Sequence, residues 1–286
     1  MYKITIALKL LSLVSITSYL SAEPLTLPGT IDTDMNIGPG TVFIDSDIQI
    51  NNGGVLSIAP GTVIKFKSYW TCIEVSGGEL IAKGNAQNKI VFTSHLDKTV
   101  GEDTTPGDNT VPEQRDWGGI VSTSVNGSPG FIDLEYCEIR YGGGEPDGAV
   151  EANTPALRIN HCTFSHIEDN GVSLNESAMS TLTHQPVIEN TYFGDNPGNG
   201  IRVFAVGEGL LDPIIRYCSF YNNGNYAIDL HDNAFPVFEG NSLDNTSTTG
   251  LAGVALHGKI NVQGTLSSPG DNFPYLLTGD LEIIEN

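Results

Sequence analysis

One phrase recurs five times between Phe131 and Leu256: Leu134-x-x-Cys137-x-Ile139, Ile159-x-x-Cys162-x-Phe164, Ile188-x-x-Thr191-x-Phe193, Ile215-x-x-Cys218-x-Phe220 and Phe238-x-x-Asn241-x-Leu243. The central small residues, at positions 137, 162, 191, 218 and 241, are 25, 29, 27 and 23 residues apart. A second apolar pair follows four of the copies: Val172/Leu174, Ile201/Val203, Ile228/Leu230 and Val254/Leu256. An irregular period near 25 residues, built from short strands, is typical of a solenoid.

The alternation inside each repeat indicates which solenoid this is. Successive side chains of a strand point to opposite faces, so Ile228 and Leu230 point one way while Asp229 points the other. Asn, Asp and Gly occupy residues 195–200 and 222–225, where a packed helix would otherwise have to run. We therefore predict an all-β, parallel β-helix formed by a single chain, with roughly eight to ten coils stacked about 4.8 Å apart.

Stacked coils place like residues in columns. The inward residues predicted for this chain are Ile159, Phe164, Ile188, Phe193, Ile215 and Phe220. Cys137 and Cys162 would lie on adjacent coils about 5 Å apart, which is inside the range for a disulfide. Thr191 fills the same column without bridging, which favours free thiols, because cysteine is also a common small core residue. Both possibilities stay open at this point.

The first 22 residues have the pattern of a secretory signal: Lys3 near the start, a mostly apolar run over residues 4–20, and Ala22 before Glu23. No second hydrophobic stretch follows, so we expect no membrane span once the signal is removed. The formal net charge of −21 and the scattered Lys and Arg residues argue against a nucleic-acid partner. The predicted layout is a signal peptide over 1–22, the β-helix over 23–262 and a C-terminal strand segment over 263–286.

The first coils carry a specific resemblance. It rests on residues 56–66 (LSIAPGTVIKF), 73–75 (IEV), 78–84 (GELIAKG), 90–94 (IVFTS) and 116–120 (DWGGI). These runs are similar to the opening of the exported, adhesin-like surface proteins of bacteria that belong to the pectate-lyase-like superfamily. The resemblance covers nearly all of the chain after residue 22. It implies a right-handed β-helix with PbH1-type repeats and a secreted or cell-surface location.

The resemblance leaves the activity open, because that superfamily contains lyases, hydrolases and non-catalytic stalks on one scaffold. We favour an exported, non-catalytic module that binds a polysaccharide or a cell-surface glycan. The alternative is a polysaccharide lyase or glycoside hydrolase. An Arg or Lys base, with groups or Ca²⁺ that neutralise a uronate, is what the resemblance implies for a lyase, and two carboxylates for a hydrolase.

Candidate catalytic residues lie on the outward face of the second strand of each coil. One outward column contains Glu151, Ser173, Arg202, Asp229 and Ala255, and the next contains Asn153, Asn175, Phe204, His231 and His257. Arg202, Asp229, His231 and His257 should therefore lie on three neighbouring coils. A solvated patch of ion pairs is the simpler interpretation of these four residues, and it is the one we favour.

Residues 95–116 form the longest polar insertion, rich in Asp, Asn, Gly and Thr. Asp97, Asp103 and Asp108 offer the oxygen ligands that a hard cation such as Ca²⁺ prefers. Their spacing differs from that of an EF-hand loop, so an ordinary solvated loop is the alternative and the favoured interpretation. No other cofactor is indicated.

The C-terminal segment copies the opening strands. Residues 42–52 (VFIDSDIQINN) align without a gap with residues 275–285 (YLLTGDLEIIE), so that Asp47 matches Asp280. We favour the interpretation that this segment begins a further module, and the alternative is that it caps the tube. An uncovered strand edge would also allow edge-to-edge self-association.

Overall fold

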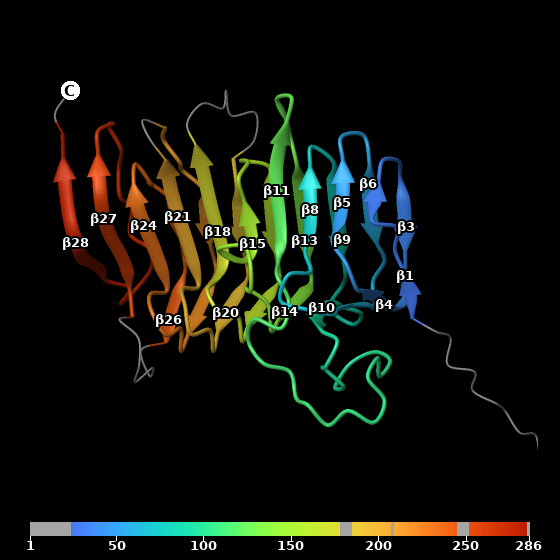
Figure 1. Cartoon of the computed structure of the whole chain (residues 1–286). Coiled ribbons are helices and arrows are strands. Elements are labelled where there is room, and N and C mark those ends of the chain that lie inside the picture. The colour runs from blue at the N-terminus through green and yellow to red at the C-terminus, as the bar shows by residue number, and fades with distance from the viewer. Residues whose placement is uncertain (1–23, 178–184, 207–208, 245–251, 285–286) are drawn as a thin grey trace, which may run out of the picture.

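The chain winds into a tube with three parallel walls (Figure 1). The computed structural model describes residues 24–177, 185–206, 209–244 and 252–284, and within these ranges every regular element is a strand. The predicted all-β solenoid is confirmed. Sheet A has nine strands, one for each coil, which agrees with the expected eight to ten. The predicted signal peptide, residues 1–22, lies outside the described residues.

Each coil passes through sheet A, then sheet B, then sheet C. In stacking order, sheet A contains β1 (Leu25–Thr26), β4 (Gly40–Ile44), β7 (Thr62–Phe66), β10 (Ile90–Ser94), β14 (Cys137–Arg140), β17 (Thr163–Ser165), β20 (Tyr192–Gly194), β23 (Ser219–Tyr221) and β26 (Ser242–Asp244). Sheet B contains β2 (Thr30–Ile31), β5 (Ile48–Asn51), β8 (Ile73–Ser76), β11 (Ile120–Val125), β15 (Gly148–Ala152), β18 (Asn170–Ser177), β21 (Ile201–Val206), β24 (Ile228–Asp232), β27 (Val254–Ile260) and β28 (Tyr275–Ile283), with β12 (Ser128–Pro129) beside β11. Sheet C contains β3 (Met35–Ile37), β6 (Val55–Ile58), β9 (Glu79–Lys83), β13 (Phe131–Glu135), β16 (Leu157–Asn160), β19 (Val187–Glu189), β22 (Ile214–Arg216) and β25 (Val237–Glu239).

The recurring phrase sets the register of the walls. Its first apolar position runs along sheet C, where Leu134 pairs with Ile159 and Ile159 with Ile188. Its last position runs along sheet A and gives a stack of aromatic rings. Phe193 lies between Phe164 and Phe220, with ring centroids 5.0 and 5.3 Å away. All six predicted inward residues are buried, each at most 1% exposed.

The bend from sheet C to sheet A is the same in five successive coils. The residue before each small residue of the phrase has a positive φ, between 48° and 60°: Tyr136, His161, Asn190, Tyr217 and Gly240. The small residues then link the coils, because the backbone N–H of Cys137 donates to Cys162 Sγ and that of Cys218 donates to Asn241 Oδ1. All four cysteines are free thiols in the structure. Burial raises the pKa of the Cys218 thiol to about 12, so this thiol stays protonated.

The C-terminal segment closes over the last coil. Ser267 Oγ accepts a hydrogen bond from the backbone N–H of Phe238, and the Phe273 ring packs edge-on against Phe220 at 5.6 Å. Strand β28 pairs in parallel with β27. The two similar segments therefore occupy different places in the fold. Residues 42–52 divide between β4 in sheet A and β5 in sheet B, whereas the whole of β28 lies in sheet B. The further module and the cap both stay predictions, because Phe273 is buried against Phe220 whereas Leu277 and Ile283 of β28 are 72% and 74% exposed.

We predict that Phe273→Ala lowers the free energy of unfolding by about 3 kcal/mol, since truncating a buried Phe loses both apolar burial and packing. Leu277→Ala in the same segment is the control. Leu277 is 72% exposed, so its truncation should change the free energy by about 0.5 kcal/mol or less. Urea unfolding followed by circular dichroism measures both values. Equal effects of the two substitutions would show that the segment does not close the core.

Candidate functional site

Asp229, His231 and His257 meet on the outer face of sheet B. Ile228 and Leu230 of β24 are buried in the core, so Asp229 and His231 project from the opposite face of the same strand. His257 in β27 is the register partner of His231. The pairing of β27 with β28 is irregular between Leu256 and Gly258, on either side of His257. Such bulges commonly redirect a side chain.

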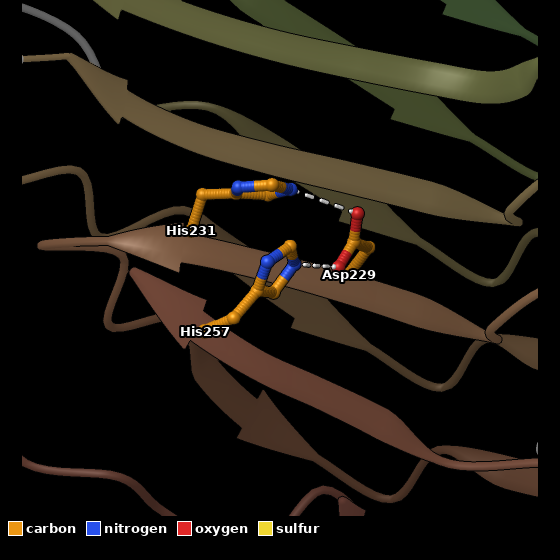
Figure 2. Close-up of side chains that lie close together, drawn as sticks. All are labelled: Asp229, His231 and His257. Carbon is orange, nitrogen blue, oxygen red and sulfur yellow. Dashed lines mark hydrogen bonds and ion pairs between the residues drawn. The ribbon is translucent and has the colours of Figure 1, made fainter. Parts of the chain in front are cut away.

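Both imidazoles turn toward one carboxylate (Figure 2). His231 Nε2 lies 3.0 Å from Asp229 Oδ2, and His257 Nε2 lies 2.7 Å from Asp229 Oδ1. The two rings are in contact, with centroids 3.6 Å apart. The side chain of Asp229 is 9% exposed, while those of His231 and His257 are 22% and 27% exposed. The carboxylate is thus covered by the two imidazoles, which remain open to solvent.

The electrostatics of this cluster depend on a balance at Asp229. Burial by itself would raise the pKa of the carboxyl group, but hydrogen bonds from His231 and His257 and the charges of these two residues outweigh burial and hold the pKa below its ordinary value. The carboxylate is therefore ionised at neutral pH, with each of its oxygens facing a different ring.

Arg202 does not join the cluster, although it pairs in register with Asp229. Its Nη1 forms an ion pair with Asp147 Oδ2 at 2.9 Å, and its guanidinium carbon lies 5.0 Å from the centroid of the Phe204 ring. Phe204 in turn contacts His231 edge-on at 5.3 Å. Of the four predicted site residues, the structure brings three together and turns the fourth toward a loop of an earlier coil.

The family assignment agrees with this architecture. A family model described as "Right handed beta helix region" matches residues 118–243 and 183–265, which together span more than half of the chain. The chain belongs to the right-handed β-helix family. No curated protein and no solved structure matched the chain.

The acidic loop of this β-helix, between β10 and β11, protrudes from the tube (Figure 1) and is held by two lysines. Lys98 Nζ donates to Asp103 Oδ2 at 3.1 Å and to the carbonyl oxygens of Thr105 and Asp108 at 2.9 and 2.6 Å. Lys65 is fully buried beneath the loop, and its Nζ donates to the carbonyl oxygens of Asp97 and Glu102 at 2.7 and 2.5 Å. The ammonium groups of Lys65 and Lys98 thus already hydrogen-bond to oxygen atoms that a metal ion could otherwise bind.

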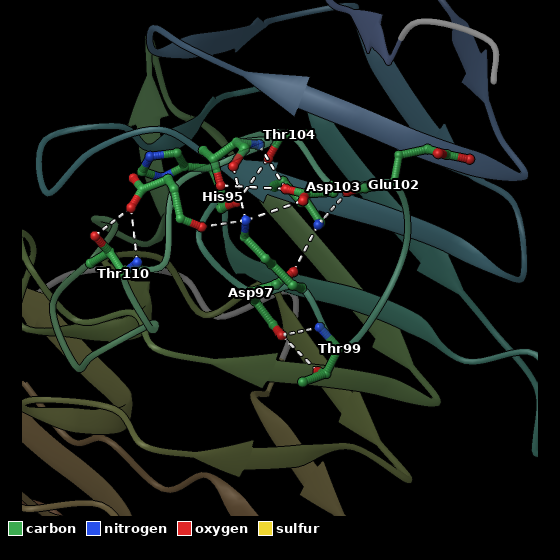
Figure 3. A network of polar contacts seen from close by, with 11 residues as sticks. His95, Asp97, Thr99, Glu102, Asp103, Thr104 and Thr110 are labelled. Atoms are coloured by element: carbon green, nitrogen blue, oxygen red, sulfur yellow. Dashed lines mark hydrogen bonds and ion pairs between the residues drawn. The ribbon is translucent and has the colours of Figure 1, made fainter.

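The three aspartates predicted to bind Ca²⁺ serve separate purposes in this loop (Figure 3). Asp97 is buried and accepts hydrogen bonds from Thr99, as Figure 3 shows. It also accepts a hydrogen bond from Thr93 and pairs with Arg140 at 2.7 Å. Asp103 and Asp108 are exposed, and each accepts a hydrogen bond from the backbone N–H two residues later. Within the described part of the chain, these three carboxylates do not form a cluster of ligand atoms. Calcium binding by this loop stays a prediction.

The burial of Lys65 and the partial burial of Arg140 could not be predicted from the repeat pattern, because each residue stands at an outward strand position where exposure is the norm. The loop covers them. The sequence contained one indication that a loop covers these residues, because the connection from β10 to β11 is far longer than the corresponding turns in other coils. Trp117 anchors the end of this loop, stacked 4.1 Å from Phe66 with its Nε1 donating to Arg140 O.

An aromatic pair in the turn between β7 and β8, with one exposed ring, was not predicted from the sequence. Trp70 is 68% exposed, and the Tyr69 ring meets it edge-on at 4.5 Å. Arg115 lies over Tyr69, 4.9 Å from the ring centroid, and donates to its hydroxyl at 3.0 Å. The Tyr69 hydroxyl donates to Glu145 at 3.3 Å. The sequence indicated this site only by placing two adjacent aromatic residues outside the alternating strand pattern.

We predict that Asp97→Asn lowers the free energy of unfolding by about 3 kcal/mol at neutral pH, because it leaves Arg140 without its buried counter-charge. Hydrogen bonds from Thr99 and Thr93 and the charge of Arg140 outweigh burial and hold the pKa of Asp97 below its ordinary value. Its stabilising contribution is therefore present above the unfolded value of about 3.9 and is lost as the pH falls through the lower folded value.

The gap between the wild type and Asp97→Asn should accordingly narrow in acid, as measured by urea unfolding across a pH series. Asp103→Asn is the control, because its side chain is 42% exposed and solvent screens its ion pair with Lys98, so the substitution should have little effect on stability. A gap that stays constant at all pH values would contradict an ionised Asp97 as the source of the stability.

Proposed function

We propose that this protein is an exported, non-catalytic right-handed β-helix module that binds glycans. The observation that supports the proposal most is the aromatic pair formed by the half-buried Tyr69 and the exposed Trp70. An aromatic face carries negative charge density, and the C–H groups of a pyranose ring pack well on such a face. Arg115 and Glu145 hold Tyr69 through its hydroxyl, so part of the surface is ordered before a ligand arrives.

The charge of the chain narrows the ligand class. A formal net charge of −21 repels polyanions such as uronate-rich polysaccharides at long range. Near the aromatic pair, Arg115 is accompanied by two acidic residues, Glu145 and Glu168, the second at 3.7 Å. Neutral glycans are therefore the proposed ligands, with polar side chains beside Trp70 that can hydrogen-bond sugar hydroxyls.

Export is part of the proposal and is supported by the signal-like pattern of residues 1–22. In the described residues no helix is both long and apolar enough to cross a membrane. A location outside the cytoplasm or on the cell surface also fits a ligand that is a polysaccharide.

The second candidate function is polysaccharide cleavage at the outer face of sheet B. The observation in its favour is the contact of Asp229 with two imidazoles, since a carboxylate that orients a histidine is a common acid–base arrangement. Against a lyase mechanism, Arg202 is paired with Asp147 rather than available as a base. Assays for new reducing ends and for the ultraviolet absorbance of unsaturated products distinguish turnover from binding alone.

We predict that Trp70→Ala abolishes retention of the protein on a neutral polysaccharide in affinity electrophoresis, with a loss of at least tenfold in affinity, because aromatic anchors contribute more than about 1 kcal/mol to such contacts. Tyr217→Ala is the matched control, since Tyr217 is an aromatic residue with 47% exposure at the bend from sheet C to sheet A in a later coil. Equal retention of Trp70→Ala and wild type on every polysaccharide tested would refute this site. Turnover that Trp70→Ala leaves unchanged and Asp229→Ala abolishes would favour the enzyme.

A further inference from the structure

The Asp229, His231 and His257 cluster has a feature that an ordinary ion-pair patch lacks. Both histidines direct the same atom, Nε2, at the two oxygens of one carboxylate (Figure 2). The ligand atoms that the three side chains offer all lie within 4.8 Å of one another. An ordinary surface ion pair joins one cation to one carboxylate. Here the imidazoles of His231 and His257 contact each other and share the carboxylate of Asp229.

The fold makes this convergence rigid. Asp229 and His231 are two residues apart on β24, and His257 is held beside His231 by the parallel ladder. The side chain of Asp229 is 9% exposed, and each of its two oxygens contacts one of the two rings. Sites carried by strands are more exact in geometry than sites carried by loops.

We propose that Asp229, His231 and His257 form a binding site for a divalent transition-metal ion, of which zinc is the best fit. Two imidazole nitrogens and one carboxylate oxygen make a donor set suited to zinc and its neighbours, rather than to calcium or magnesium, which take oxygen ligands. Three protein ligands leave a fourth position for water in a tetrahedral site.

The distances fit this assignment. In a tetrahedral zinc site, nitrogen and oxygen ligands about 2.1 Å from the metal lie about 3.4 Å from one another. The two Nε2-to-oxygen distances, 3.0 and 2.7 Å, are somewhat shorter, and no pair of ligand atoms exceeds 4.8 Å. A metal that takes Nε2 displaces the proton used in these hydrogen bonds, which passes to Nδ1 in a neutral ring and to solvent only where Nδ1 already carries a proton.

The surroundings allow a cation at this position. Two cationic side chains on the strands of this face already have acidic partners: Arg202 pairs with Asp147 at 2.9 Å, and Lys259, two residues after His257, pairs with Glu282 at 3.5 Å. Phe204 lies beside His231 and limits water on that side of the ring. The acidic chain as a whole attracts cations, which raises their concentration near the surface without selecting one.

Titration of the full chain, first stripped of metal with a chelator, with zinc alone tests the proposal. Isothermal calorimetry should show one zinc ion for each chain, and zinc should raise the melting temperature. Asp229→Asn, His231→Asn and His257→Asn should each weaken zinc binding by at least about 100-fold, because even outer partners of metal ligands contribute about 10- to 100-fold. Calcium, titrated in the same way, should not compete with zinc.

His161→Asn is the matched control. His161 lies at a bend of the tube, stacked on Tyr136 at 4.6 Å, and Asn190 occupies the equivalent position of the next coil with the same sign of φ. This variant should bind zinc as the wild type does. Cobalt provides a second readout, since tetrahedral coordination by the cluster gives visible absorption bands that the three cluster variants should lose.

Far-UV circular dichroism shows which variants are folded, and three separate variants keep the test decisive where one fails to fold. Zinc that binds only weakly and at several sites, with no loss in the folded cluster variants, would overturn the proposal. Calcium that displaces zinc at similar concentrations would do the same. None of these measurements depends on glycan binding. A failure of the proposed glycan function would therefore not affect the test of the zinc site.

Discussion

The hydrogen bonds between stacked parallel strands are the constraint on which the rest of this structure depends. Each coil pairs its backbone with the coils on either side in all three walls, and the spacing of about 4.8 Å forces equivalent residues into columns. Inside the tube the consequence is the stack of Phe164, Phe193 and Phe220. Outside the tube the same constraint places His231 next to His257. Core and candidate site thus arise from one geometric rule.

Residues in the repeat could be placed from the sequence because their neighbours are fixed by that rule. Strand alternation assigned Asp229 and His231 to the outer face, and repeat spacing assigned His257 to the next coil. Arg202 could not be placed in the same way, since its partner Asp147 belongs to a turn of an earlier coil rather than to its column. The side-chain direction of a long residue depends on such contacts from outside the repeat, and the sequence periodicity contains no information about them.

The loop over sheet A shows a second limit of periodicity. Lys65 is at an outward position and is fully buried, because the chain between β10 and β11 folds back over it. Burial of its ammonium group lowers the pKa of Lys65, while the charge of Asp97 opposes that shift. The charges that sequence reasoning assigned to a solvated or calcium-binding loop are therefore in part internal to the protein. Residues 42–52 and 275–285 are similar in sequence but lie in different sheets, because the position of a strand in the stack decides which sheet it joins.

The loop between β10 and β11 and the Asp229 cluster differ in the groups that pair with their aspartates. In the loop, each aspartate is already satisfied: Asp97 by Arg140 and threonines, and Asp103 by Lys98 and a backbone N–H. A cation entering there would have to displace fixed ammonium or guanidinium groups, which costs the desolvation that those pairs have already overcome. At Asp229 the partners are imidazoles, which lose a proton far more readily than lysine or arginine and then become ligands. The proposed zinc ion at Asp229 would therefore need only the movement of imidazole protons, whereas a cation in the loop would have to break salt bridges.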